Sequence, residues 1–354
     1  MTATPNKKLK ILHVVRRYGP VGGMERYVWE ITRELRDLGH QVEVLCEVCL
    51  ADKPDGVIVH ELGTIAPRPR WLALLRFGNR VANWLKTNPH QRFLIHSHER
   101  LSSHHVTTFH GPPFATVFDK SWWRLISLRV AMQLFLEKRE LYSAQYIVPN
   151  SPFIKQQLAH YYPKISQKLT TPIVPGVVCN KVRTTAHVPA DGGTVGFVGK
   201  EWKRKGLPFA IAIVTQLRAL RPNLKFRVVG PAIADIASLF SKNENDQLLG
   251  WSDAAHYAEF DVLLHPAKAE PYGMVISEAM AARLPVVISD VCGAAPQVSS
   301  EAGAVLSLNA AIKDWVYALE QQLSRNSLVP QFVHSWKQVA QEYECIYYRI
   351  NLKS

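Results

Sequence analysis

Apolar and polar residues alternate along the chain in two different periods, which predicts short strands followed by helices. The first strand is expected at Lys10–Val15, and a glycine-rich turn, Gly19–Gly23, separates it from an amphipathic helix over Met24–Leu38. The apolar residues of that helix recur every three or four positions, and Gly39 ends it. Strands that alternate with helices in this way are typical of parallel sheets with helical crossovers.

The rest of the chain follows the same scheme. Further strands are expected at Gln41–Leu45, Phe93–Ile95, Val106–Phe109, Tyr146–Val148, Thr194–Val198, Phe226–Val229, Asp261–Leu264 and Pro285–Ile288, and further helices at Leu207–Leu220, Gly273–Ala282, Ala310–Ser324 and Val333–Tyr348. Ser151 followed by Pro152 is typical of a helix start. The pattern therefore predicts an α/β protein with a parallel sheet in each half.

A break in the pattern divides the chain. Residues Thr171–Asp191 are rich in proline and glycine and show no sustained periodicity. A chain of 354 residues is long enough for two domains. We place an N-terminal domain at residues 1–172, a C-terminal domain at 173–335 and a last helix at 336–354.

Composition narrows the setting. The chain is 47% hydrophobic, yet no apolar run approaches the roughly 18–20 residues that a membrane span needs. The first apolar run, Ile11–Val15, is also too short for a signal peptide, so a cytoplasmic protein is expected. Five cysteines do not form a disulfide framework. Cys46 and Cys49 have no second pair of ligands nearby, which indicates thiols rather than a zinc site.

The net charge of +13 is uneven along the chain. Residues 1–172 hold 24 Lys and Arg against 13 Asp and Glu, and the remaining residues hold 18 against 16. The N-terminal half is therefore expected to meet an anionic partner. Nucleic acid, an anionic membrane surface and a phosphorylated acceptor all fit the charge. Nucleic acid is disfavoured, because the sequence contains no zinc module, aromatic RNA-binding strand or helix-turn-helix signature.

Two glutamates stand at the ends of the segment Glu270–Glu278, separated by seven residues. The first follows a predicted buried strand, and the second lies inside the next helix. Tyr272, Gly273 and Met274 occupy the helix start, where backbone N–H groups are unpaired and the helix dipole is positive. Such a place can bind hydroxyl groups and developing negative charge. An acidic loop followed by a solvated helix glutamate is the alternative.

A basic loop, Gly199–Gly206 (GKEWKRKG), joins a predicted strand to a predicted helix. Its cations Lys200, Arg204 and Lys205, together with the N–H groups of the helix start, suit a diphosphate. A solvated basic turn is the alternative. The matching turn of the N-terminal half contains Gly22 and Gly23, whose backbone amides can face a phosphate, although a plain tight turn would have the same composition.

Histidines gather near predicted strand ends in the N-terminal half. His110 follows the strand Val106–Phe109, and at this end of a parallel sheet it is expected to face a ligand or to be a structural histidine. The others nearby are His96, His98, His104 and His105. A metal site is disfavoured, because only Glu99 accompanies them at ligand spacing.

A basic helix is expected over residues 68–86, where Arg76, Arg80 and Lys86 are interleaved with tryptophans. A second such helix is expected to begin at Lys120 and to include Trp122, Trp123, Arg124 and Arg129. Basic amphipathic helices with tryptophan suit an anionic membrane interface. An ordinary half-buried helix with solvated cations is the alternative.

Several of these segments together resemble one family. The stretch Asp261–Val287, with Glu270, Glu278 and the closing Leu-Pro-Val, resembles the donor-binding block of the retaining GT-B glycosyltransferases of family four. The basic loop and the Gly-Gly-x-Glu-Arg turn at residues 22–26 resemble the same family. Within it, the basic loop and the segments Leu264–Ala267 and Val291–Gly293 look like the lipopolysaccharide inner-core glucosyltransferases. The resemblance implies two Rossmann-like domains with a central cleft, and a last helix that crosses back to the N-terminal domain.

The resemblance also implies residue roles. It gives Glu270 to the donor sugar, Gly273 and Met274 to sugar or phosphate through their N–H groups, and Glu278 to the ribose. It gives Arg204 and Lys205 to the diphosphate, with Lys200 behind them, and the Gly22–Gly23 turn to the phosphate from the other domain. His110 is expected near the donor sugar. The implied catalytic set is Glu270, His110, Arg204 and Lys205, and the implied donor-binding set is Gly22, Gly23, Lys200, Arg204, Lys205, Tyr272, Gly273, Met274 and Glu278. No metal and no cofactor is expected.

The implied function is transfer of a hexose, with retention, from a nucleotide sugar. The expected donor is a UDP-sugar, and the expected acceptor is a glycan or glycolipid of lipopolysaccharide core or other cell-envelope synthesis. The enzyme is expected in the cytoplasm, peripheral on the inner face of the membrane. A nucleotide-sugar epimerase of the same fold and a non-catalytic glycan-binding scaffold are the alternatives.

Overall fold

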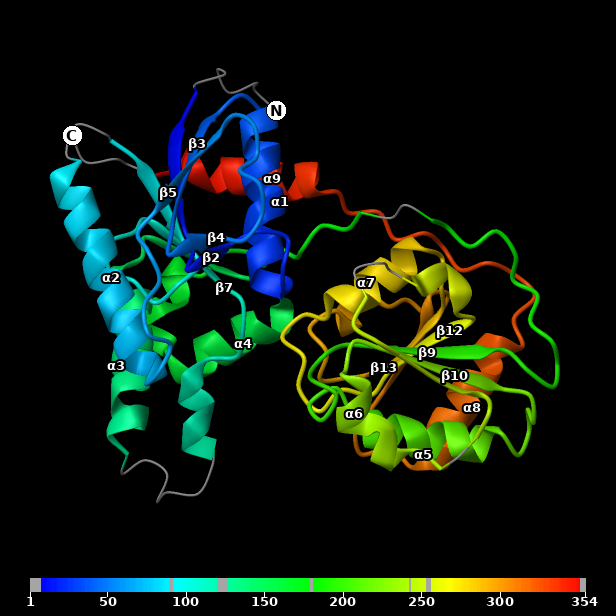
Figure 1. The fold of residues 1–354 in the computed structure, drawn as a ribbon. Coiled ribbons are helices and arrows are strands. Elements are labelled where there is room, and N and C mark those ends of the chain that lie inside the picture. The colour runs from blue at the N-terminus through cyan, green and yellow to red at the C-terminus, as the bar shows by residue number, and fades with distance from the viewer. Residues whose placement is uncertain are drawn as a thin grey trace. The chain divides into compact units, whose positions relative to one another are not determined.

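The computed structural model describes residues 8–88, 92–119, 127–178, 181–241, 243–252 and 256–350. The chain divides into two compact units (Figure 1): an N-terminal unit, Met1–Gly176 with His334–Ser354, and a C-terminal unit, Val177–Val333. The division lies within the expected linker, a few residues beyond residue 172. Each unit contains a six-stranded parallel sheet flanked by helices, and each is described by itself below.

The N-terminal sheet has the order β5-β3-β1-β6-β7-β8. Its strands are β1 (Lys10–Val14), β3 (Gln41–Cys46), β5 (Val57–Glu61), β6 (Leu94–Ser97), β7 (Val106–Phe109) and β8 (Tyr146–Pro149), and a separate pair is formed by β2 (Arg17–Tyr18) and β4 (Val48–Cys49). Strands β3 and β5 are added on one side of β1, and the later strands β6, β7 and β8 are added on its other side. The strand order therefore reverses between β1 and β6, which is where doubly wound folds bind ligands.

The two faces of β1 meet different helices, because successive side chains of a strand point to opposite sides. Leu12 and Val14 pack with α2 (Arg70–Thr87) in one core cluster. On the opposite face, the ring of His13 lies against the ring of His96 of β6. Figure 1 shows α1 (Gly23–Asp37) beside α9 (Trp336–Tyr347), two helices from opposite ends of the chain.

The other N-terminal helices pack near β7 and β8, where Leu141, Ile154 and Leu158 form a core cluster with Phe109 and Ile147. They are the 3-10 helices η1 (Phe114–Asp119) and η3 (Pro163–Lys168) and the α-helices α3 (Leu128–Ser143) and α4 (Pro152–Tyr161). The predicted start of α4 is confirmed, because the Ser151 hydroxyl accepts a hydrogen bond from the Ile154 N–H at 3.2 Å. The helix expected from Lys120 is found from Leu128 and includes Arg129. Residues 120–126 lie outside the described part.

The C-terminal sheet has the matching order β11-β10-β9-β12-β13-β14. Its strands are β9 (Thr194–Val198), β10 (Lys225–Val229), β11 (Asp246–Gly250), β12 (Val262–His265), β13 (Val286–Ser289) and β14 (Gly303–Leu306), and its helices are α5 (Leu207–Leu217), α6 (Ile233–Ile236), α7 (Met274–Ala281) and α8 (Ile312–Leu323), with short 3-10 turns η4 (Ala237–Leu239), η5 (His256–Glu259) and η6 (Ala295–Gln297). Its switch point lies between β9 and β12.

One core cluster of the C-terminal unit lies on one face of that sheet. Leu207 and Ile213 of α5 pack with Trp315 and Leu319 of α8 against Phe197 of β9, all fully buried. Figure 1 shows α5 and α8 together below the sheet and α7 on its other side. Burial on both faces explains why the central strands are continuous apolar runs.

The structure also shows the state of the described cysteines and the character of the described helices. The four cysteines that the structure describes are free thiols; Cys46 is buried at the end of β3, and Cys49 is half-buried. Within the described residues, no helix combines the length and the apolar character that a membrane crossing requires.

Candidate functional site

A buried carboxylate lies at the switch point of the C-terminal sheet. Glu270 follows β12, and the basic loop follows β9, so both sit at the carboxyl ends of neighbouring strands. The Glu270 carboxylate is 3.0 Å from Lys205 Nζ and 3.4 Å from Arg204 Nη1. His265 Nε2, at the end of β12, lies 3.2 Å from the same carboxylate. The structure thus brings together Glu270, Arg204 and Lys205 and adds a histidine that the sequence did not assign.

These contacts decide the charge of Glu270, which is only 7% exposed. Burial alone raises the pKa of this carboxyl. The hydrogen bond to His265 and the charges of Lys205 and Arg204 outweigh burial and hold the pKa well below its usual range. Burial, and then the charge of Lys205, lowers the pKa of His265. The centre is therefore an ionised carboxylate held between two cations.

Two glycines, Gly199 and Gly206, leave the space that the Lys205 side chain and the basic loop occupy. Gly199 has a φ of +143°, and a Cβ there would lie 2.2 Å from Lys205 Cδ. Gly206 caps α5 with a φ of +80°, and a Cβ there would lie 2.1 Å from the Pro266 carbonyl oxygen. The lysine stem therefore lies directly against the backbone of the strand end. The second cation, Arg204, is anchored by Glu201 and by the Ala269 carbonyl.

The start of α7 lies beside this carboxylate in sequence. Gly273 is the N-cap, with a φ of +98°, and Met274 is the first helical residue. The first N–H groups of a helix have no partner inside it. Tyr272 is buried, and its hydroxyl group is hydrogen-bonded to Ser277 Oγ at 2.7 Å and Gln297 Oε1 at 2.8 Å. Its side chain therefore supports the helix start, and only its backbone is left to meet a ligand.

Glu278 lies on the second turn of α7 and is half-buried. Its Oε2 accepts a hydrogen bond from the Tyr257 hydroxyl at 2.6 Å. Because Met274 and Glu278 are four residues apart, they share one face of the helix. Tyr257 comes from η5, a segment that the sequence analysis left without a role.

Lys200 behaves differently from its neighbours. Its Nζ lies 4.1 Å from the centre of the Trp251 ring, and 61% of Trp251 is exposed. In the described part of the chain, Lys200 thus contacts an aromatic ring, whereas Arg204 and Lys205 reach Glu270.

The N-terminal switch point has a chain of histidines. His13 lies on β1, His98 follows β6, and His110 follows β7. His13 Nδ1 is 3.1 Å from His98 Nε2, and His98 Nδ1 is 2.9 Å from His110 Nε2. Burial lowers the pKa of His13 and of His110 to about 3, so both rings are neutral at pH 7. The partly exposed His110 is the outer end of this chain.

The glycine pair of this unit forms the start of α1. Gly22 is the N-cap, with a φ of +72°, and Gly23 is the first helical residue. The buried Glu25 carboxylate forms an ion pair with Arg17 of β2. The Gly-Gly-x-Glu motif therefore includes its own brace, which was not foreseen.

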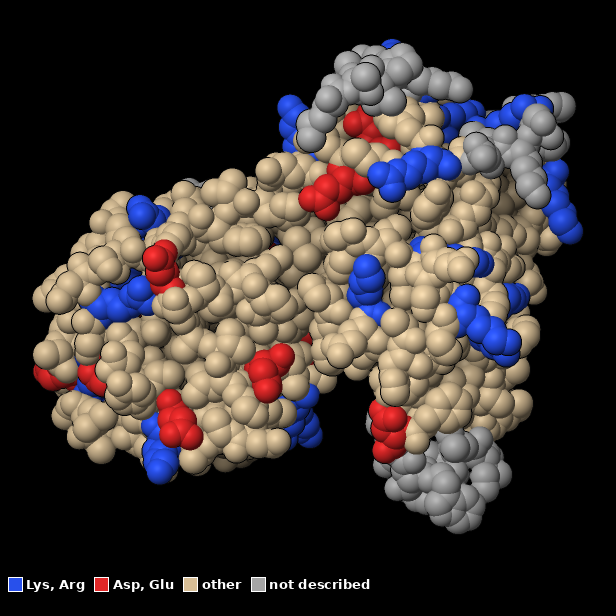
Figure 2. All heavy atoms as spheres, turned by 180° about the vertical axis from the view of Figure 1, so that it is seen from behind, with Lys and Arg blue, Asp and Glu red and all other residues tan. Residues whose placement is uncertain are grey.

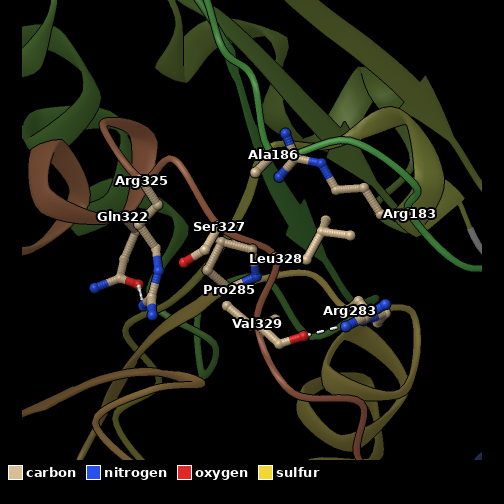
Figure 3. A pocket seen from close by; sticks show the side chains of 9 residues that line it. All are labelled: Arg183, Ala186, Arg283, Pro285, Gln322, Arg325, Ser327, Leu328 and Val329. Carbon is tan, nitrogen blue, oxygen red and sulfur yellow. Dashed lines mark hydrogen bonds between the residues drawn. The ribbon is translucent and has the colours of Figure 1, made fainter.

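A small pocket lies elsewhere in the C-terminal unit (Figure 3). Arg183, Arg283 and Arg325 line it, but each guanidinium already has an internal partner, respectively Asp261, the Val329 carbonyl and Gln322. Asp261 precedes β12, so this pocket is at the amino ends of the strands, opposite Glu270. These contacts hold the segments around Arg183 and Val329 against the rest of the C-terminal unit.

Helix α2 does not expose its tryptophans as a membrane anchor would. Arg76, Arg80 and Lys86 are exposed, but Trp84 is half-buried, with its ring 6.1 Å from that of Phe93. Arg80 donates to the carbonyl groups of Leu62 and Gly63. The helix has the ordinary build of a polar outer face and an apolar inner face.

Two doubly wound units, with paired cations and carboxylates at the switch point of the second, define a glycosyltransferase of the GT-B class. Two family models match: "Glycosyltransferase Family 4" at residues 21–181 and "Glycosyl transferases group 1" at residues 192–325. The chain belongs to the family-four glycosyltransferases of the GT-B fold, and it is an enzyme. The resemblance to this family and its fold is confirmed.

Relatives agree with this family. The chain is 25% identical over 300 residues to a GDP-mannose-dependent alpha-mannosyltransferase of Mycolicibacterium smegmatis, covering 77% of each chain. It is 28% identical over 291 residues to a phosphatidyl-myo-inositol mannosyltransferase of the same organism, covering 76% of this chain and 73% of the relative. The crystal structure of WaaG, a glycosyltransferase involved in lipopolysaccharide biosynthesis, superposes with a TM-score of 0.76 at 20% identity over 94% of each chain, which shows the shared fold.

Proposed function

We propose that the chain transfers a hexose from a nucleotide-diphosphate sugar, with retention, to a lipid-linked glycan or glycolipid of the cell envelope. The observation that carries the proposal is the Glu270 carboxylate, buried between Lys205 and Arg204 at the β9–β12 switch point. Two fixed cations in a site of low polarity stabilise the charge that develops on a leaving diphosphate. The carboxylate beside them accepts hydrogen bonds from sugar hydroxyls.

The neighbouring groups take the rest of the donor. Backbone N–H groups at Gly273 and Met274 bind sugar or phosphate oxygens, and Glu278 binds the ribose hydroxyls. For the N-terminal unit we keep the roles that the family resemblance implies, the phosphate for the Gly22–Gly23 turn and the sugar for His110. Phosphate charge is met by side chains, so the reaction needs no metal and no cofactor. Activity should persist after dialysis against EDTA, and restoration of activity by Mg²⁺ or Mn²⁺ would contradict this.

The donor is proposed to be a UDP-sugar, and GDP-mannose is the competing candidate because one relative depends on it. A panel of UDP-glucose, UDP-galactose and GDP-mannose, tested by thermal shift and by slow donor hydrolysis, separates the two. If no nucleotide sugar raises the melting temperature, the transferase proposal fails at its first step. The anomeric configuration of the product, read by NMR, tests retention.

The ribose role of Glu278 has its own test. Glu278→Gln should weaken nucleotide binding about tenfold to a hundredfold, since hydrogen bonds to a charged acceptor are worth about 1.5–3 kcal/mol. Glu301→Gln, at an exposed position of the same unit, is the matched control. Equal affinities for the two variants would contradict the ribose role.

We propose that the N-terminal unit contacts an anionic membrane surface, since this is the unit to which we assign the lipid-linked acceptor. On the face drawn in Figure 2, Lys and Arg side chains are scattered rather than gathered in one patch. Helix α3 instead exposes Leu128, Phe135 and Tyr142, at 69%, 52% and 41%. Their spacing of seven places them on one helix face, and Lys138 lies beside them, with its Nζ 5.7 Å from the Tyr142 ring centre. Apolar residues flanked by cations suit a membrane interface.

Sedimentation with vesicles tests this contact. Arg76→Ser with Lys86→Ser should lower affinity for phosphatidylglycerol vesicles about tenfold to thirtyfold, at roughly 1 kcal/mol per cation. Phe135→Ser should lower it further, and Lys313→Ser on α8 should not. Binding that none of the N-terminal changes alters would remove the membrane from the proposal.

A further inference from the structure

The three histidines at the N-terminal switch point share one hydrogen-bonded line. Two bonds join them, His13 Nδ1 to His98 Nε2 and His98 Nδ1 to His110 Nε2. His13 and His98 are 0% and 5% exposed, and the ring of Tyr27 meets His110 edge-on at 4.9 Å between centres. None of the three rings can turn without breaking a bond or a ring contact.

Neutral rings constrain one another in such a line. A neutral imidazole has one N–H and one bare nitrogen. If His13 donates from Nδ1, then His98 must accept at Nε2 and donate from Nδ1, and His110 must accept at Nε2. If His98 donates to His13 instead, every proton moves to Nε2. The three rings are therefore all Nδ1–H or all Nε2–H.

The inner end of the line decides between the two. His13 Nε2 is fully buried and has no hydrogen-bond partner in the described part of the chain. In the Nε2–H state, this atom would be a buried donor without an acceptor, which folded proteins avoid more strictly than an unused acceptor. In the Nδ1–H state, it is only an unused lone pair. The Nδ1–H arrangement is therefore the one with the lower free energy.

A bound metal is the competing explanation for these rings. Nitrogens of His13, His96 and His98 lie within 4.8 Å of one another. However, both nitrogens of His96 are already used, Nδ1 by the Tyr347 hydroxyl at 2.6 Å and Nε2 by the Thr108 hydroxyl at 2.8 Å. Zinc would have to displace one of these bonds. These hydrogen bonds account for the contacts of the rings without an ion.

We propose that His13 and His98 are positioning residues that hold His110 in the Nδ1–H form, so that His110 presents a fixed donor to an oxygen of the substrate. This rests on the proposed function in one respect only, the contact of His110 with substrate. The oxygen belongs to a sugar hydroxyl, which can accept such a bond. His110 then aligns the sugar and does not act as a base, because Nδ1, the ring nitrogen that does not contact His98, carries the proton.

The tautomers are directly measurable. Long-range ¹H–¹⁵N correlation spectra of protein labelled at histidine distinguish a protonated ring nitrogen from a bare one, and single His→Gln variants assign the signals. We expect a protonated Nδ1 and a bare Nε2 at His13, His98 and His110. Protonated Nε2 at His110, or one equivalent of zinc in the purified protein, would overturn the proposal whether or not the enzyme is active.

Kinetics test the positioning role. His13→Leu removes the donor at the head of the line and should lower kcat/KM about threefold to tenfold, the value of one neutral hydrogen bond. His13→Asn places an amide N–H near the former Nδ1 and should restore most of that loss. A merely structural role would not give this rescue.

His104 supplies the matched control. It is buried, it makes one hydrogen bond, from Nε2 to the Glu140 carbonyl, and its Nδ1 has no partner in the described residues. His104→Leu should destabilise the fold about as much as His13→Leu and leave kcat/KM unchanged. Equal losses of kcat/KM in the two variants would refute the positioning role. A wild-type protein that transfers no sugar would instead refute the proposed function.

Discussion

The two switch points use opposite electrostatics on the same strand order. The C-terminal unit buries a charge and balances it: Glu270 is ionised between Lys205 and Arg204. The N-terminal switch point buries neutral groups instead. Burial lowers the pKa of His13 and of His110 to about 3, and elsewhere in the same unit burial raises the pKa of Glu140 on α3 to about 8. The same strand order therefore has a charged centre at one switch point and neutral rings at the other, which suits the proposed contacts with phosphate and with sugar hydroxyls.

The contributions of Glu270 and Glu140 to stability depend on pH in opposite directions. The pKa of Glu270 is lowered, so its stabilising contribution is present above the ordinary pKa of 4.5 and is lost only as pH falls below that value. The pKa of Glu140 is raised, so its contribution is full below 4.5 and is lost as pH rises toward 8.

The largest effect is expected from removing a charge of the C-terminal site. Lys205→Met should lower kcat about a hundredfold to a thousandfold, since one lost group that stabilises developing charge costs this much. Lys225→Met, at the exposed start of β10, is the control. Steady-state kinetics with the donor found in the panel measure it. A wild-type kcat in Lys205→Met would end the charged interpretation of this site.

A second effect of similar size concerns the neutral unit. Between pH 5 and 8, ionisation of Glu140 should lower the free energy of unfolding of the wild type by about 2–4 kcal/mol. The Glu140→Gln variant should not show this fall, because its amide stays neutral at both pH values. Thr107 donates to Glu140 at 2.7 Å, a bond that glutamine can keep. Urea unfolding at several pH values gives the curves. Glu99, whose pKa is raised to about 7, adds to the slope in both proteins, so parallel curves for wild type and variant would contradict the neutral state of Glu140.

The two sites also differ in what the sequence could predict. Arg204 and Lys205 share one loop, and Glu270 to Glu278 is one short segment, so local pattern and family resemblance both point to them. The histidine line joins residues 85 and 12 positions apart in the chain. Only the strand order β1-β6-β7 brings them together. The sequence indicated His98 and His110 by their places at strand ends and gave no signal for His13. His265 is only five residues from Glu270, and it was missed because a place at a strand end does not by itself give a histidine a role.

Secondary structure shows a similar limit. Central strands such as Val106–Phe109 and Thr194–Val198 were predicted to the residue, because both faces are buried and the apolar run is continuous. The outer strands β5, β11 and β14 were not predicted. Each lies at the edge of its sheet with partly exposed residues, so its pattern resembles a loop. The sequence left open whether the tryptophans of α2 meet a membrane or belong to an ordinary half-buried helix, and Trp84 is half-buried.

A smaller effect is expected from a change in the N-terminal unit that should alter stability but not nucleotide binding. Tyr343→Phe removes a buried hydroxyl group that is hydrogen-bonded to the hydroxyl groups of Tyr27 and Thr108, at 2.8 and 2.6 Å. Stability should fall about 1–3 kcal/mol, the cost of leaving buried polar groups unpaired. The exposed Tyr317→Phe is the control. All the lost contacts lie in the N-terminal unit, so the dissociation constant for nucleotide should not change. A parallel loss of nucleotide affinity would show that the two sites are coupled.

The smallest effect concerns the third cation of the basic loop. Lys200 lies over the exposed Trp251 ring and is not paired with Glu270 in the described structure. An exposed cation–π contact is worth about 0.5–1 kcal/mol, so Lys200 is held near the loop but not aimed by a buried partner. Lys200→Met should raise the dissociation constant for the donor only about twofold to fivefold, and Trp251→Leu should have nearly the same effect if the ring is what holds the lysine. Titration calorimetry of the two single variants and the double variant measures this, because a shared role makes their effects non-additive. If Lys200→Met weakened binding as much as Lys205→Met, burial beside Glu270 would not be what distinguishes the cations of this loop.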